Sequence, residues 1–146
     1  GKEMAYQVKR KKLYEEEFQL AEEDGTVVHT LHVALDADSM VKKLSEKQIE
    51  LIHALNCVKE AKADAEGLEI LGIAVVAMIE AVFGVEDAKV ILDFYNNRYI
   101  ELCNEVVPFI TDVVIPEVRK IAAQNKKATL SQYNRKQRRI LQFGKK

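Results

Sequence analysis

The sequence predicts an α+β fold, with an N-terminal β-hairpin packed on a bundle of three main α-helices. Residues 27–35 alternate between two faces, as a strand does when one face is buried. From residue 36 onward apolar residues recur at helical spacing, and both prolines, Pro108 and Pro116, fall late in the chain. The 146 residues fit a single domain, which we expect over residues 1–122. A basic C-terminal tail or helix should follow over residues 123–146.

Two extended runs joined by a tight turn form the predicted hairpin. Leu13, Phe18 and Leu20 lie in the first run, and residues 27–35 form the second. Asp24 and Gly25 supply the turn. Since an isolated two-stranded hairpin is marginally stable in water, its apolar face must either pack on the helices or join a sheet with another subunit.

The first helix is expected to begin at Asp36 or Asp38 and to run to about Ala63. A short carboxylate at a helix start accepts hydrogen bonds from amides that have no partner within the helix. One side of this helix carries an apolar stripe, made of Met40, Val41, Leu44, Leu51, Ile52, Leu55 and Val58. This pattern predicts an amphipathic helix with one buried face.

The second helix, from about Glu66 to Phe83, is apolar on nearly every side, and its three glutamates form the one polar wedge. Such a helix must be enclosed by partners, either within the chain or across a subunit interface. Gly84 is placed to end it. The longest uninterrupted apolar run, from Ile70 to Ile79, is shorter than the about 20 residues that a membrane span needs. We therefore predict a soluble protein that does not bind membranes.

The third helix is predicted to begin near Glu86 and to kink or break at one or both prolines, because a proline lacks the amide of a helical hydrogen bond. Its stripe contains Ala88, Ile91, Leu92, Tyr95, Tyr99, Leu102, Cys103 and Val106. Two residues lie off this stripe, and the apolar segment FITDVVI lies between the prolines. From these two places we take six candidates for a partner-binding surface, namely Val90, Phe94, Phe109, Ile110, Val113 and Val114.

The net charge of −1 conceals strong segregation along the chain. It amounts to +4 over residues 1–12, −14 over residues 13–116 and +9 over residues 117–146. The main basic candidates in the tail are Lys126, Lys127, Arg135, Lys136, Arg138 and Arg139. A basic arm on an acidic body suits nucleic acid, an acidic partner or the acidic body of a neighbouring copy. We favour a homo-oligomer, with nucleic acid as the alternative.

The sequence indicates neither an enzyme nor a cofactor site. It contains no Walker loop, dinucleotide fingerprint or nucleophile signature. His29 and His32 stand three apart on a strand and therefore point to opposite faces. His53 and Cys57 share a helix face, but a zinc site needs more ligands than two. Cys57 and Cys103 do not have the spacing of a disulfide framework. Both are therefore predicted to be free thiols in a reducing cytosol.

One stretch of the chain, FGVEDAKVILDFYNNRYIELCNEVVPFITDVVIPEV over residues 83–118, resembles part of a known family. The family comprises small tail assembly chaperones encoded by long-tailed bacteriophages and prophages of Gram-positive bacteria. The closest features are the FG before an acidic helix start, the ILDFYNNRYIEL core and the PFITDVVIP close. The N-terminal hairpin followed by a helix rich in Lys and Glu also resembles this family, so the similarity covers most of residues 4–122.

The resemblance implies a non-enzymatic role in the cytoplasm of the bacterial host. Such chaperones keep the long, hydrophobic tape measure protein soluble and recruit tail tube subunits, and they are absent from the mature virion. Such a role needs an exposed apolar groove, and the second helix beside the segment between the two prolines could supply one. Two alternatives remain open: a nucleic-acid-binding phage accessory protein that acts through the basic C-terminal tail, and a structural tail or head-completion subunit.

Overall fold

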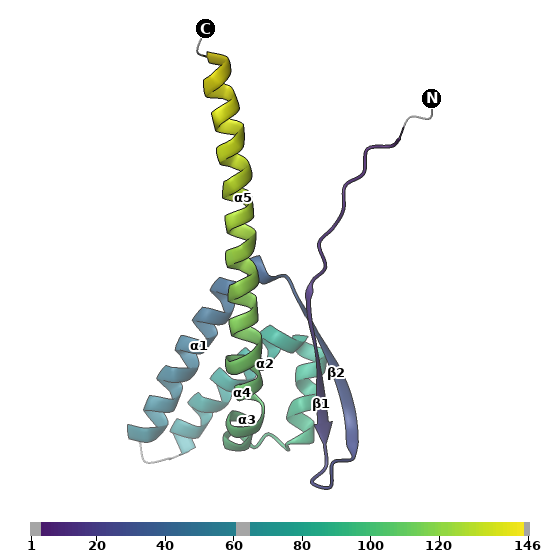
Figure 1. Ribbon diagram of the computed structural model, residues 1–146. Coiled ribbons are helices and arrows are strands. Elements are labelled where there is room, and N and C mark those ends of the chain that lie inside the picture. Colours follow the sequence, from purple (N-terminus) through teal and green to yellow (C-terminus); the bar gives the residue numbers. More distant parts are fainter. Residues whose placement is uncertain (1–3, 61–64, 145–146) are drawn as a thin grey trace.

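The computed structural model describes residues 4–60 and 65–144 and has the expected α+β architecture (Figure 1). An antiparallel hairpin precedes three long helices, and short helical pieces link the second long helix to the third. The elements in order are β1 (Tyr14–Ala21), β2 (Val27–Leu35), α1 (Ala37–Glu60), α2 (Ala65–Phe94), α3 (Tyr99–Glu105), α4 (Val107–Phe109), a π-helical turn (Ile110–Val114) and α5 (Ile115–Gly144).

The hairpin packs on the helices, which is one of the two outcomes that its sequence allowed. Residues 14, 16, 18 and 20 of β1 pair with residues 35, 33, 31 and 29 of β2, so the predicted apolar residues share one face. The Thr26 amide donates a hydrogen bond to Asp24 Oδ1 at 2.9 Å, and Gly25 takes a φ of 91°. These two features close the turn as predicted. On the inner face, the ring of Phe18 contacts those of Phe83 and Phe109.

Asp36 provides the start of α1. Its carboxylate accepts a hydrogen bond from the Ser39 amide at 3.2 Å, and its carbonyl oxygen accepts one from the Met40 amide at 3.2 Å. Leu44 and Leu51 of the predicted stripe are buried. By contrast, Ile52 and Leu55 are 53% and 42% exposed, so the predicted stripe is only partly buried. The predicted end at Ala63 falls outside the described residues.

Gly84 interrupts α2 as the sequence indicates. Its φ of 81° and ψ of 165° are not helical, and the chain turns there before it resumes a helix (Figure 1). Within the described residues, α2 is the one helix that is long and apolar enough to cross a membrane. Half of its most apolar stretch is buried inside the domain.

The prediction of one continuous helix from Glu86 to Val106 is wrong. Asn96 and Asn97 adopt positive φ values of 50° and 56°, which end the helix. The Asn97 amide donates to the Leu92 carbonyl at 2.9 Å, and the Asn96 amide donates to the Asp93 carbonyl at 3.1 Å. These are the two hydrogen bonds of a Schellman motif, with asparagine in the place that glycine usually takes. The chain restarts as α3, and the apolar stripe continues into the core despite the break.

The last helix bends as predicted, but at Val106, between α3 and α4, where φ is −101°, and not at either proline. Pro108 falls in the first turn of α4, where a missing amide costs no helical hydrogen bond. A π-helical turn precedes Pro116, and the Ile115 amide bonds to the Ile110 carbonyl across it. The chain then remains helical to Gly144.

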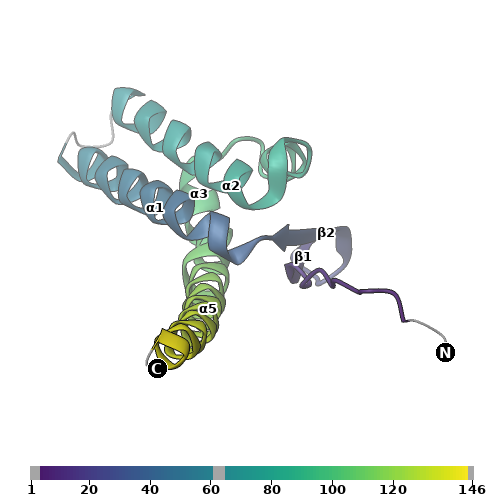
Figure 2. The ribbon, with the colours of Figure 1, turned by 90° about the horizontal axis from the view of Figure 1, so that it is seen from above.

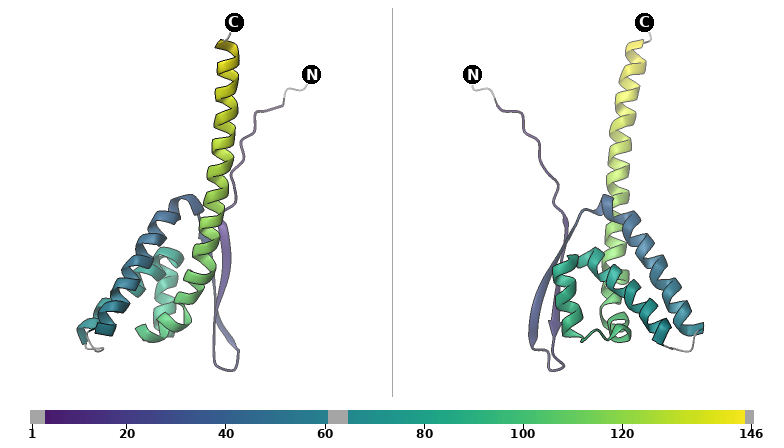
Figure 3. Two further views of the ribbon diagram at one scale, coloured as in Figure 1. Left: turned by 60° about the vertical axis from the view of Figure 1, so that its left-hand side comes forward. Right: turned by 180° about the vertical axis from the view of Figure 1, so that it is seen from behind.

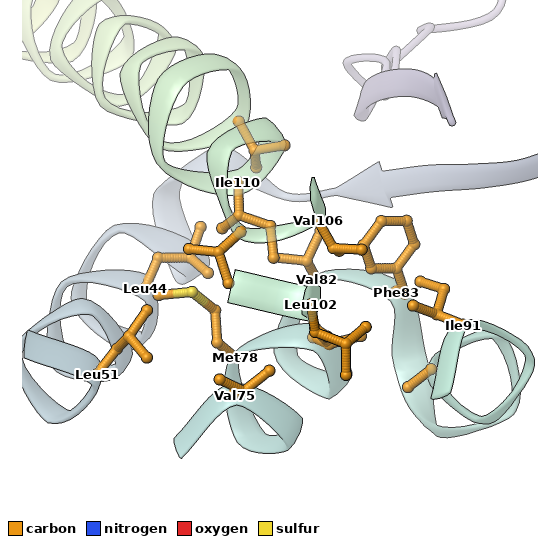
Figure 4. Close-up of a cluster of buried hydrophobic side chains, with 14 of the residues drawn as sticks. Leu44, Leu51, Val75, Met78, Val82, Phe83, Ile91, Leu102, Val106 and Ile110 are labelled. Atoms are coloured by element: carbon orange, nitrogen blue, oxygen red, sulfur yellow. The ribbon is translucent and has the colours of Figure 1, made fainter. Parts of the chain in front are cut away.

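The core forms where α1, α2, α3 and the π-helical turn meet (Figure 4). Leu44, Met78, Leu102 and Ile110 contribute side chains that are at most 1% exposed. All buried side chains of the described residues are apolar. Seen from above, α1 and α2 lie side by side and α5 points out of their layer (Figure 2). The C-terminal part of α5 extends well beyond this body (Figure 3).

Candidate functional site

The exposed side of α2 carries an open apolar groove of about 780 Å³. Ile73, whose side chain is 67% exposed, is its most prominent apolar residue. The groove is lined by Ala65, Leu68, Glu69, Gly72, Ile73, Val76, Ala77, Glu80 and Tyr99. Since α1 and the core take up the opposite side of this helix, the chain itself leaves the apolar surface in the groove uncovered.

Tyr99 forms one wall of the groove because Gly72 leaves room for its ring. A Cβ atom added at Gly72 would lie 2.6 Å from Tyr99 Cε2, a distance too short for two carbon atoms in contact. The break at Asn96 and Asn97 brings the chain back toward α2 just before Tyr99. The groove is therefore shaped by residues from both sides of this break.

The groove is acidic as well as apolar. Between Ala65 and Phe83 the chain has three glutamates, Glu66, Glu69 and Glu80, and no lysine or arginine. All three side chains are exposed, and none of them forms an ion pair with another described residue. An apolar helix flanked by basic side chains is the ligand that this combination favours.

Two of the six predicted partner-binding residues are core residues. Ile110 and Val114 have no exposed surface, because the π-helical turn points both side chains into the domain. Phe109 is partly buried, with its ring 4.7 Å from that of Phe18 and 5.9 Å from that of Phe83. The expectation that these side chains face a partner is therefore corrected for Ile110 and Val114, and Phe109 helps to attach the hairpin.

The remaining three predicted residues do not gather into one surface. Phe94 packs edge-on against Tyr95 at 5.1 Å and against His29 at 6.4 Å, so it too contacts the hairpin. Val90 is partly buried against the core. Val113, at 40% exposure, is the one member of the six with an exposed side chain.

The basic tail is a helix rather than an irregular segment. The side chains of residues 126–141, which we term the free half of α5, are all exposed. Its six predicted basic residues, from Lys126 to Arg139, form no ion pair within the described part of the chain. The helix leaves the body at Asn125, which donates to an Asp38 carboxylate oxygen at 3.3 Å and accepts from Lys11 at 2.9 Å.

The free half of α5 is also amphipathic. At 100° per residue its four large apolar side chains fall within an arc of about 100°. These are Leu130, Tyr133, Ile140 and Leu141, each at least 50% exposed. Arg135 and Arg139 lie on the other side of the helix. This half therefore presents a mainly apolar face, on which Lys126 and Gln137 also lie, and a basic face, and neither face has a partner in the described structure.

The histidine and cysteine side chains of the described residues are spread over β2, α1 and α3. No three His, Cys, Asp or Glu side chains among residues 4–60 and 65–144 are placed to hold a metal ion. The strand register puts His29 and His32 on opposite faces, as predicted. Cys57 Sγ lies 3.8 Å from His53 Nε2 on the surface of α1. Burial raises the pKa of the Cys103 thiol, which reduces its thiolate fraction at neutral pH.

The groove residues Leu68, Ile73, Val76 and Tyr99 were not among the candidates drawn from the sequence. A partial signal was present, since residues 65–83 are too apolar to be solvated and carry glutamate as their one polar residue type. What the sequence did not show is which side of α2 the other helices leave open. No family model, no curated protein and no solved structure matches this chain.

Proposed function

We propose that this protein is a tail assembly chaperone of a long-tailed bacteriophage or prophage. Its groove on α2 binds an apolar helix of the tape measure protein, and the complex recruits tail tube subunits in the cytoplasm of the bacterial host. The observation that carries this proposal is the exposed apolar surface around Ile73. The resemblance of residues 83–118 to this chaperone family supplies the identity of the client.

The dimensions of the groove fit a helical client. It follows α2 from Ala65 to Glu80, which is 16 residues or about 24 Å of helix. A client helix of about four turns would lay its apolar face into such a groove. Contiguous apolar surface is uncommon on soluble monomers unless it binds something. The three glutamates should favour client segments that carry Lys or Arg beside their apolar face.

Co-expression with the tape measure protein tests this proposal. The protein should keep the tape measure protein in the soluble fraction and copurify with it. Ile73→Asp should abolish both effects, because it places a charge in the apolar groove. Ile49→Asp is the matched control, since Ile49 on α1 is also 67% exposed but lies outside the groove. Equal activity of the two variants would contradict the assignment of the groove.

The free half of α5 supports a second candidate function, nucleic-acid binding. Its basic side chains are exposed and unpaired within the described structure, as in proteins that neutralise phosphates. Under this alternative, random-sequence duplex DNA should bind with an affinity that falls steeply with salt, and Arg135→Glu should weaken binding. A structural tail subunit would instead be found in purified virions, where a chaperone is absent.

A further inference from the structure

We propose that, before a client binds, the groove on α2 holds the free half of α5 from a second copy of this chain. The inference rests on the proposed function in that the same groove accepts the client helix, which then displaces α5. It concerns how the apolar groove stays covered until the client arrives. Its occupant is identified by length, by charge and by the arrangement of apolar side chains.

The two surfaces match in length. The free half of α5 spans residues 126–141, and the groove follows α2 over residues 65–80. Each covers 16 residues, or about 24 Å of helix. The whole of one exposed helix can therefore lie along the whole of the other.

The two surfaces carry charges of opposite sign, and each surface carries charges of one sign only. The α2 segment carries Glu66, Glu69 and Glu80 without a basic residue, and the free half of α5 carries its lysines and arginines without an acidic one. Since neither set has an ion pair in the described structure, both remain available. Opposite potentials on two facing surfaces favour their encounter and oppose pairing between like surfaces.

The apolar side chains of α5 also have the arrangement that a groove requires. Leu130, Tyr133, Ile140 and Leu141 lie within an arc of about 100° on one side of the free half, where Lys126 and Gln137 also fall. Lys127 and Lys136 flank this strip, each about 90° from its centre. They can therefore face the glutamates beside the groove when the strip lies in it.

The groove of the same chain is out of reach. From Ile115 to Gly144, α5 is an uninterrupted helix that points away from the body (Figures 1 and 3). Contacts of Asn125 with Asp38 and Lys11 fix the direction in which it leaves. No residue of α5 lines the groove. Only a second copy can bring this helix to α2 without breaking it. The copies then form either a reciprocal dimer or a head-to-tail series.

Sedimentation velocity on the full chain without client tests the inference. We expect association at about 50 mM salt that weakens at about 500 mM, because the charge pairs become screened. Leu130→Asp and Ile73→Asp should each raise the dissociation constant about tenfold or more. Ile49→Asp should leave it unchanged, and circular dichroism checks that each variant is folded. A wild-type chain that stays monomeric at low salt would overturn the inference.

Charge reversal tests whether the glutamates of α2 pair with the basic side chains of α5. A Glu69→Lys, Glu80→Lys variant and a Lys127→Glu, Lys136→Glu variant should each associate weakly alone and associate with each other when mixed. A Glu46→Lys, Glu50→Lys variant, altered on the exposed side of α1, serves as the control and should behave as the wild type. Failure of the two reversed variants to associate on mixing would refute the pairing.

Cross-linking locates the contact. A photoreactive side chain at position 133, combined with isotope labelling of one population, should give inter-chain products with residues 65–80. Products with other segments, or with copurified nucleic acid instead of protein, would overturn the inference. The client is absent from all these measurements. A wild-type chain that binds the tape measure protein but does not self-associate would refute this inference alone, and one that self-associates but does not bind the tape measure protein would refute the proposed function alone.

Discussion

The ring of Tyr99 lies directly on the backbone of Gly72, so close that a Cβ atom at position 72 would stand 2.6 Å from Tyr99 Cε2. This contact joins the first residue of α3 to the third turn of α2 and places the phenol in the wall of the groove. The shape of the groove therefore depends on the absence of one side chain.

Gly72→Ala tests this relationship through a double-mutant cycle. In a helix interior the change to alanine alone should stabilise by about 0.5–1 kcal/mol. Against Tyr99 the added methyl must displace the ring, at a cost of about 1–3 kcal/mol. We expect Gly72→Ala to stabilise the Tyr99→Ala variant but not the wild type, as measured by urea denaturation. Equal effects in both backgrounds would show that the two residues do not interact.

Gly84→Ala should destabilise the fold by about 1–3 kcal/mol. With φ at 81° and ψ at 165°, Gly84 occupies a region that is essentially closed to residues with a Cβ atom. No atom crowds the position, so the cost comes from the backbone alone. Gly84→Asn should be no better tolerated, because asparagine favours the left-handed helical region and not this one. An unchanged urea midpoint for either variant would contradict this account.

Much of the fold could be predicted because it follows from local pattern. Alternation over residues 27–35 identified the inner face of the hairpin, and Asp36 and Gly84 marked a helix start and a helix break. The break at Asn96 and Asn97 escaped prediction, since the apolar period continues through it and asparagine only weakly indicates a left-handed conformation. At Asn96 and Asn97 the apolar pattern predicts a continuous helix, whereas the backbone leaves the helical conformation.

The candidate site was less predictable, because it depends on packing between distant segments. The segment FITDVVI is apolar, but composition alone does not say which of its side chains point inward. As a π-helical turn it buries Ile110 and Val114 and exposes Val113. Similarly, the apolar character of α2 was visible, whereas its uncovered side is set by where α1 and α3 pack.

Substitutions at Phe109 and Val113 should differ in their effect on the free energy of unfolding. Phe109 packs against Phe18 and Phe83, so Phe109→Ala should cost about 2–3 kcal/mol, somewhat less than for a fully buried phenylalanine. Val113→Ala should change the free energy of unfolding by about 0.5 kcal/mol or less, as is usual for exposed positions. Urea denaturation measures both. If Phe109→Ala unfolds like the wild type, the aromatic cluster does not hold the hairpin.

The stability of the hairpin should fall at alkaline pH. Burial raises the pKa of Tyr14 above its ordinary value, and so do its 2.9 Å hydrogen bond to Glu16 and the charges of Glu16 and Glu117. The folded state therefore holds the phenolic proton more tightly than the unfolded state. This contribution is complete below the ordinary tyrosine pKa of about 10 and is lost as the pH rises above it. Thermal denaturation should show a smaller loss between about pH 9 and pH 11 for Tyr14→Phe than for the wild type. Identical profiles would exclude Tyr14 as the source.

The asparagine pair should be replaceable by glycine but not by alanine. Asn96 and Asn97 both have positive φ, which costs about 1 kcal/mol or more for a residue with an ordinary Cβ atom. Asn96→Ala should therefore destabilise by about 1 kcal/mol, whereas Asn96→Gly should be neutral or stabilising. Because the turn returns the chain to Tyr99, the double variant Asn96→Ala, Asn97→Ala should also weaken client binding by displacing the groove wall. Copurification with the tape measure protein measures this effect, with the double glycine variant as control. If both double variants bind alike, the turn does not shape the groove.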